Sequence, residues 1–177
     1  AVDRIAYDVL AYRTRQTLDY FSSGAFQTAR LASLNPSFGL QVELPDFVSG
    51  AGASFADWND YDVGLARLEG FAGYLDRTIA MLREGVSQGV TQPRIIVENI
   101  LSQVDAMLAI PVEKSPFHAA IDRLPDTIDA TGRARYARDY RAVIADRIYP
   151  GYERWREYLS QTYLPLATAA PGRWAMK

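Results

Sequence analysis

The side chains with the clearest chemical potential are one histidine and a group of carboxylates. His118 is the only histidine among 177 residues, and the chain has no cysteine. A zinc site of the HExxH type requires two imidazoles one helical turn apart and a glutamate base. A Ser–His–Asp triad would have to use His118, and we expect no GxSxG elbow that could present its serine. We therefore predict no catalytic residue, metal ligand or cofactor in this chain, and interpret His118 as a structural or surface side chain.

The carboxylates Asp57, Asp60 and Asp62 cluster at the start of a predicted long helix. Acidic groups in a first helical turn are favoured by the helix dipole, which explains them without a catalytic role. A pair of carboxylates can hydrolyse glycosidic bonds when both face a cleft several ångströms apart. An independent enzyme that uses these carboxylates therefore remains a third functional hypothesis, behind the two given below.

Composition excludes two classes of partner. The net charge is −2, and the arginines between residues 133 and 156 are interleaved with acidic residues, which is typical of a solvated helix face. Nucleic-acid binding, which needs a concentrated basic face, is not expected. No apolar run approaches the roughly 20 residues of a membrane span, so none is predicted. The absence of cysteine leaves the compartment undecided.

Apolar residues recur at helical spacing through most of the chain. The clearest stripe runs from Trp58 to Val86, with Ser54 as the expected N-cap and Gly70 and Gly73 as the expected bend. Further helices are predicted over about 3–22, from a Thr91 cap to about 109, briefly near 117–124, and from Asp129 or Thr131 to Tyr163, with a kink at Pro150.

The segment of about 25–53 has a different character, because Asn35-Pro36, Gly39 and Pro45 interrupt any helical pattern while many apolar residues remain. We predict one long non-helical connection there. The expected fold is all-α: an irregular antiparallel helical bundle that forms a single domain over residues 1–177.

Six stretches of the sequence, taken in order, carry a likeness to a known family. They are DRIAYDVLAYRT, LNPSFGLQVELPDF, ADWNDYDVGLARLEGFAGYLDRTIAMLREGVSQGVTQPRIIVENILSQVDAML, SPFHAAIDRLP, YPGYERWREYLSQTYLPLA and GRWAMK. The chain resembles a large bacterial family catalogued as domain of unknown function eight hundred eighty-five. Members are largely helical and several times longer, and they resemble zinc metallopeptidases of the gluzincin type, with an HExxPGH-like motif well downstream.

This chain has no counterpart of that motif. The resemblance therefore implies a fragment, namely an amino-terminal or central helical portion, with zinc held only by the parent protein. It implies the remainder of the polypeptide as partner and a peptide as substrate. Relatives often carry a secretion or lipoprotein signal, so it also implies an exported or lipid-anchored parent. The alternative is a stand-alone helical module that binds a protein or ligand through its aromatic residues.

The resemblance also draws attention to the loop LNPSFGLQVELP. We hypothesise that the segment from Asn35 to Pro45 lines one wall of the parent's substrate cleft, with Asn35, Phe38 and Gln41 as candidate cleft-lining residues. Its apolar and turn-rich composition motivates this hypothesis. A packed connection without contact to substrate is the alternative.

Overall fold

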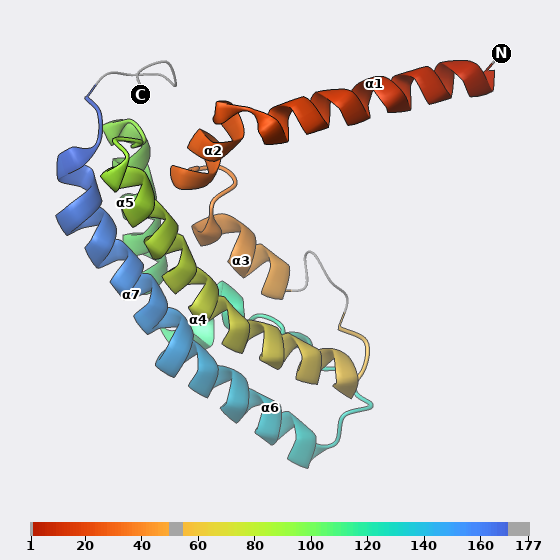
Figure 1. Cartoon of the computed structure of the whole chain (residues 1–177). Helices are drawn as coiled ribbons and strands as arrows, with labels where there is room; N and C mark the ends of the chain where they lie inside the picture. The colour runs from red at the N-terminus through yellow and green to blue at the C-terminus, as the bar shows by residue number, and fades with distance from the viewer. Residues whose placement is uncertain (1, 50–54, 170–177) are drawn as a thin grey trace.

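The computed structural model describes residues 2–49 and 55–169, and it confirms an all-α helical bundle (Figure 1). Within these residues the regular elements are helices, and the nearest approach to a strand is an isolated bridge between Pro93 and Thr168. The α-helices are α1 (Val2–Ser22), α2 (Gly24–Leu31), α3 (Leu40–Val48), α4 (Trp58–Ser87), α5 (Arg94–Leu108), α6 (Ala130–Val143) and α7 (Tyr149–Tyr158).

Short helical segments complete the fold. Three 3₁₀ turns follow α5, and two π-helical segments and a final 3₁₀ turn join or follow α6 and α7. These are η1 (Val112–Lys114), η2 (Pro116–His118), η3 (Ile121–Arg123), η4 (Ile144–Ile148), η5 (Leu159–Tyr163) and η6 (Leu164–Leu166). The elements α6, η4, α7 and η5 follow one another without a gap, and we call residues 130–163 the C-terminal helix.

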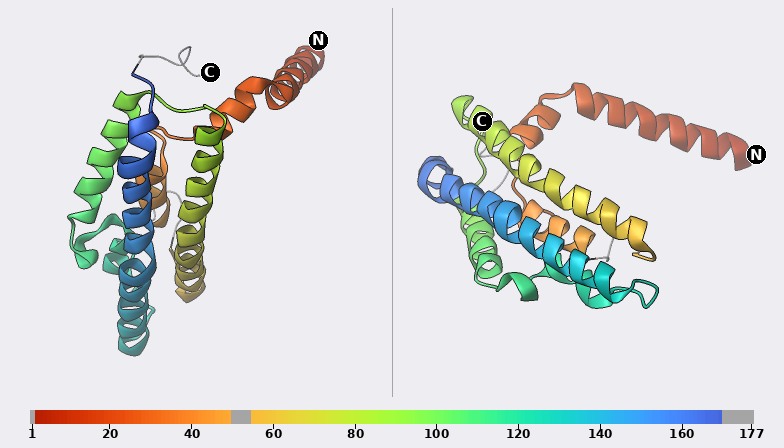
Figure 2. Two further views of the ribbon diagram at one scale, coloured as in Figure 1. Left: turned by 60° about the vertical axis from the view of Figure 1, so that its left-hand side comes forward. Right: turned by 90° about the horizontal axis from the view of Figure 1, so that it is seen from below.

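The C-terminal helix and α4 lie side by side and run in the same direction, as the views agree (Figures 1 and 2). Tyr140 bonds to Tyr61 near the start of both helices, and Arg154 pairs with Asp76 near their middle. α3 and α5 run in the opposite direction and pack against this pair. The bundle is therefore irregular, with two long helices in parallel and two shorter ones reversed.

α4 starts at a different cap from the one expected. Asp57 is the N-cap, and it forms a capping box with Asp60; Ser54, the predicted cap, lies outside the described residues. The helix then runs for 30 residues and passes through Gly70 and Gly73 without a break. Buried side chains on both sides of these glycines pack into the core, which holds the helix together where propensity alone would weaken it.

The predicted non-helical connection over about 25–53 is wrong, because it contains α2 and α3. Gly24 is the first residue of α2. Pro45 lies inside α3, although proline removes one helical hydrogen bond. Leu44 and Val48 are buried beside it, so tertiary packing offsets that loss. Among the described residues of this segment, the non-helical part shrinks to residues 32–39 and Ser49.

Of the other predicted helix boundaries, one is confirmed and the rest are corrected. Asp129 is confirmed as the cap of α6, since its carboxylate accepts a hydrogen bond from the Gly132 amide at 2.7 Å. Pro93, not Thr91, is the N-cap of α5, and the short helix expected near 117–124 is a series of 3₁₀ turns. The C-terminal helix does not break at Pro150; instead the preceding residues 144–148 widen into a π-helix, where the bonding pattern can absorb the missing N–H.

Buried tyrosines join the helices. The tyrosine seam is the set Tyr61, Tyr136, Tyr140, Tyr149 and Tyr152, each of which donates its hydroxyl to a backbone carbonyl of another segment, at distances from 2.7 to 3.2 Å. Their rings fill the core while the hydroxyls fix position, since a buried hydroxyl without a partner costs about 1–3 kcal/mol. Geometry of this kind sets the register between neighbouring helices.

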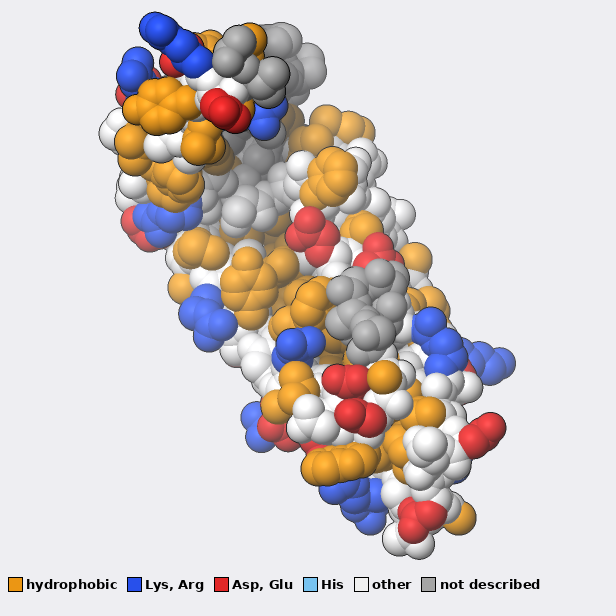
Figure 3. Space-filling view, turned by 90° about the vertical axis from the view of Figure 1, so that its right-hand side faces the viewer, with side chains coloured by type: hydrophobic (Ala, Val, Ile, Leu, Met, Phe, Trp, Pro, Cys, Tyr) orange, Lys and Arg blue, Asp and Glu red, His pale blue; other side chains and the backbone are white. Residues whose placement is uncertain are grey.

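α1 does not join the bundle. It extends away from the other helices in every view and packs on α2 through the ring of Phe26, which lies 4.8 Å from that of Phe21 and 5.7 Å from that of Tyr20 (Figures 1 and 2). Figure 3 views the molecule from the side on which α1 extends, and hydrophobic side chains lie among charged ones on that surface. The large exposed ones are Ile5, Tyr7, Val9, Leu10, Tyr12, Leu18, Tyr20 and Phe21.

Two glycines of α4 provide a matched test of the packing. A methyl group added at Gly85 would press on the carbonyl of Leu31, where α2 meets α4, whereas one at Gly70 would meet open space. We expect Gly85→Ala to lower the free energy of unfolding by about 1–3 kcal/mol through overpacking. Gly70→Ala should raise it by about 0.5–1 kcal/mol through helix propensity. Urea unfolding of both variants measures this, and a loss of stability in Gly70→Ala would contradict the packing.

Alkaline pH should unfold the bundle through its tyrosines. Burial raises the pKa of Tyr163 to about 12, and burial also raises the pKa values of Tyr140 and Tyr152. Because the folded pKa exceeds the unfolded value of about 10, the contribution of Tyr163 is complete below pH 10 and is lost as the pH rises to 12, a loss of about 3 kcal/mol. Unfolding free energies measured between pH 9 and 12 should fall less steeply in Tyr163→Phe than in wild type, and equal slopes would refute this.

Candidate functional site

The loop predicted to line a cleft does border a groove. A hollow of about 410 Å³ lies between α2, the 32–39 connection and the segment before α5. Asn35 and Phe38 line it, and Gln41 does not. The full lining is Ala25, Thr28, Ala29, Ala32, Ser33, Leu34, Asn35, Phe38 and Gln92. A smaller hollow of about 170 Å³ shares Leu34, Asn35 and Gln92 with it, so the two form one continuous groove.

Asn35 gives the connection its shape. Its side-chain oxygen accepts hydrogen bonds from the amides of Ser37 and Phe38 at 2.8 and 3.0 Å, which is a turn that asparagine stabilises locally. The turn leaves the Phe38 ring 72% exposed at the edge of the groove. An exposed aromatic ring on a fixed turn is a surface that a ligand can pack against.

Gln41 holds this turn from the buried side. The side chain is buried, and its amide donates to the Asn35 carbonyl at 3.0 Å and to the Gln103 side-chain oxygen at 2.8 Å. Gln103 in turn donates to the Pro36 carbonyl, and Gln92 donates to the Ala32 carbonyl at 2.6 Å. Three glutamine amides thus hold both ends of the connection, so Gln41 positions the groove wall without facing the groove.

The groove can bind but carries no acid or base. Its lining consists of apolar, amide and hydroxyl side chains, with no titratable group among them. Amides that flank apolar surface suit an extended, peptide-like ligand, whose own N–H and C=O groups need partners when they leave water. Chemistry on such a ligand would have to come from residues outside this groove.

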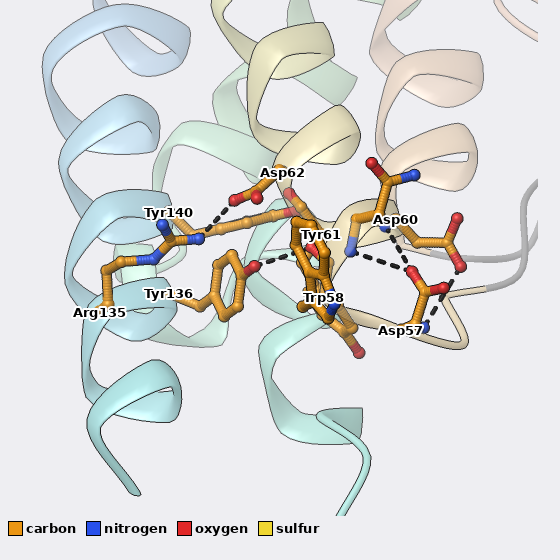
Figure 4. A network of polar contacts seen from close by, with 9 residues as sticks. Asp57, Trp58, Asp60, Tyr61, Asp62, Arg135, Tyr136 and Tyr140 are labelled. Atoms are coloured by element: carbon orange, nitrogen blue, oxygen red, sulfur yellow. Dashed lines mark hydrogen bonds and ion pairs between the residues drawn. The ribbon is translucent and has the colours of Figure 1, made fainter. Parts of the chain in front are cut away.

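The carboxylates at the start of α4 serve structure (Figure 4). Asp57 accepts hydrogen bonds from the amides of Asn59 and Asp60 at 2.9 and 3.1 Å, and Asp60 accepts one from the Ala56 amide at 2.8 Å. Asp62 pairs with Arg135 of α6. Caps and an interhelical ion pair account for all three, and they do not face a common cleft among the pockets of the described chain.

The expectation that the chain contains no GxSxG spacing is wrong, because Gly85–Gly89 reads GVSQG. The pentapeptide spans the end of α4, however, and the Ser87 hydroxyl donates to the Glu84 carbonyl at 2.7 Å in the same helix turn. Ser87 is therefore a helix-end residue here and not a nucleophile on an elbow.

Among the residues that the structure describes, no three histidine, aspartate or glutamate side chains lie close enough together to hold a metal ion. His118 is buried in the turn η2, and its interpretation as a structural or surface side chain stays a prediction. His118 also lines a pocket, which its sequence context did not predict.

Comparison with known proteins identifies the family. A sequence model for a family described as "Bacterial protein of unknown function (DUF885)" matches residues 1–175. The chain belongs to this family. Among curated proteins and among solved structures, nothing matches it. None of the helices in the described residues is long and apolar enough to cross a membrane.

The Asx-type turn can be tested against its neighbour. Asn35→Ala removes the acceptor of two backbone amides and should lower the free energy of unfolding by about 1 kcal/mol. Ser37→Ala changes an exposed side chain on the same turn and should have an effect within about 0.5 kcal/mol. Chemical denaturation compares the two, and equal stabilities would show that Asn35 does not shape the turn.

Proposed function

We propose that this DUF885 chain is the non-catalytic helical portion of a zinc metallopeptidase-like hydrolase, where it supports the catalytic part and lines one wall of its substrate groove. The observation that carries the proposal is α1. A helix of 21 residues extends from the bundle with most of its large apolar side chains exposed. Such a surface needs a cover in the working protein.

The cover on α1 is assigned to the remainder of the same polypeptide. An isolated helix of this length is marginal in water, and helices in proteins draw most of their stability from a packed apolar face. Burial of one large aliphatic or aromatic side chain contributes about 1.5–3 kcal/mol. Because α1 carries eight such exposed side chains, docking against another folded part would stabilise both.

A peptide is the ligand that suits the groove beside α2. Asn35, Ser33 and Gln92 offer polar partners for a peptide backbone, and Phe38 and Ile95 offer apolar surface. The zinc ion, its ligands and the general base would all come from the remainder of the polypeptide, and the described part of this chain gathers no three side chains that could hold an ion. The chain's own contribution is to position the substrate.

The second candidate is a stand-alone helical module that binds a separate protein through α1. The same exposed side chains support it, because the bundle already has a continuous core of its own. The two candidates differ in what covers α1: a covalently linked part in the first and an independent protein in the second.

Kinetics of the natural gene product test the leading proposal. A chelator should abolish hydrolysis of peptide substrates, and added zinc should restore it. Phe38→Ala should raise KM about tenfold by removing apolar contact with the substrate, while kcat changes little. Ser37→Ala, on the same turn but outside the groove lining, is the matched control. Unchanged kinetics in a folded Phe38→Ala enzyme would rule out a role for the groove, and activity that survives chelation would rule out zinc.

A further inference from the structure

A second pocket, of about 570 Å³, lies between the 3₁₀ turns η1 and η2 and the C-terminal helix. The chain's only histidine lines it, together with two arginines, two carboxylates and three alanines. The lining residues are Glu113, His118, Ala137, Arg138, Arg141, Ala142, Ala145 and Asp146.

His118 is built into this pocket. Its side chain belongs to a residue that is only 9% exposed, and Nδ1 is buried without a hydrogen-bond partner among the described residues. Nε2 is not among the buried atoms that lack a partner, and it makes no hydrogen bond within the described residues. It is therefore the nitrogen that the pocket can reach. The buried Nδ1 is a polar atom that the described residues leave without a partner, and Nε2 is the nitrogen that can meet a group in the pocket.

Charged groups of both signs border the pocket. Arg141 donates from Nε to Glu113 at 2.5 Å, and Arg138 donates from Nε to Asp139 at 2.9 Å. The terminal nitrogens of both guanidinium groups make no hydrogen bond within the described residues, so each keeps donors for a carboxylate. Asp146 lies on the same rim and has no ion pair in the described structure. Two positive and two negative lining charges balance, which favours neither a simple anion nor a simple cation.

The apolar part of the lining consists of three alanines of the C-terminal helix, two of which, Ala142 and Ala145, are exposed. Ala145 and Asp146 belong to the π-helical segment η4. A π-helical turn shifts the following side chains relative to a regular helix, and such turns are frequent at functional sites. Here the turn brings an alanine and a carboxylate to the pocket that His118 faces.

We propose that this pocket binds a free amino acid with an apolar side chain. The amino acid's carboxylate accepts hydrogen bonds from Arg138 and Arg141, its ammonium group meets Asp146, and its side chain packs against the alanines and the imidazole. A zwitterion carries both signs of charge and can therefore pair with both signs on this rim. The proposal is independent of the proposed function, because it rests on the residues of this pocket alone.

The single histidine makes the test direct. Imidazole signals of the protein, followed by NMR, report on His118 only. Titration with L-leucine should shift them along a saturable curve with a Kd of about 1 mM, an affinity typical of a small, partly open site. N-acetyl-leucine lacks the ammonium group and isoamylamine lacks the carboxylate, so both should bind at least about tenfold more weakly.

Two variants with opposite expected effects separate binding from fold damage. Arg141→Ala removes a carboxylate donor and should weaken leucine binding about tenfold. Glu113→Gln breaks the same ion pair but frees Arg141, so it should tighten binding. Both side chains are more than half exposed, and folding is checked by the melting temperature. Arg147→Ala, exposed and outside the lining, is the control.

The outcomes of these titrations either support or overturn the amino-acid site. A saturable shift that Arg141→Ala weakens and Glu113→Gln strengthens supports the site. The absence of a saturable shift, equal affinity for leucine and isoamylamine, or a change of the same sign in both variants would overturn it. Loss of the leucine preference over N-acetyl-leucine in Asp146→Asn would assign the ammonium group to Asp146, and an unchanged preference would contradict that assignment.

Discussion

The fold depends on the hydrogen bonds of the tyrosine seam. Each hydroxyl leaves water only because a backbone carbonyl of another segment receives it, so the rings cannot pack in another register without losing those bonds. Tyr140 and Tyr136 fix the C-terminal helix against α4, Tyr149 fixes it to the end of α5, and Tyr152 reaches Leu40 at the start of α3. Removal of any one of these hydroxyls would take away a hydrogen bond that joins two segments.

The tyrosine seam also fixes the position of the groove, because Tyr152 bonds to Leu40 beside the turn that borders it. Leu40 directly follows the turn made by Asn35 to Gly39, and the glutamine amides of α3 and α5 hold that turn from beneath. The wall beside α2 is therefore held by hydrogen bonds to the bundle, which suits a positioning role. α1 is the opposite case, a helix whose apolar side chains remain exposed. The proposed role as a supporting part of a larger hydrolase would account for both features of this DUF885 member.

Much of the fold could be predicted from the apolar stripes. The stripe of α4 and the Asp129 cap were visible in the sequence because they depend on local spacing. α3 was missed because Pro45 and Gly39 indicated a loop, while burial of Leu44 and Val48, a tertiary effect, decides the outcome. The role of Gln41 was hidden because its partner Gln103 lies 62 positions away. The pocket at His118 was hidden for the same reason, since its arginines belong to another helix.

The most direct measurement is amide hydrogen exchange of residues 2–22, in the 177-residue chain alone and in the longer natural protein of the proposed function. If the remainder of the polypeptide covers α1, this helix should exchange fast in the isolated chain and about a hundredfold more slowly in the longer protein. The amides of α4 should be protected in both. Equal exchange of α1 in the two proteins would contradict the claim that this helical portion docks onto the rest of its own polypeptide.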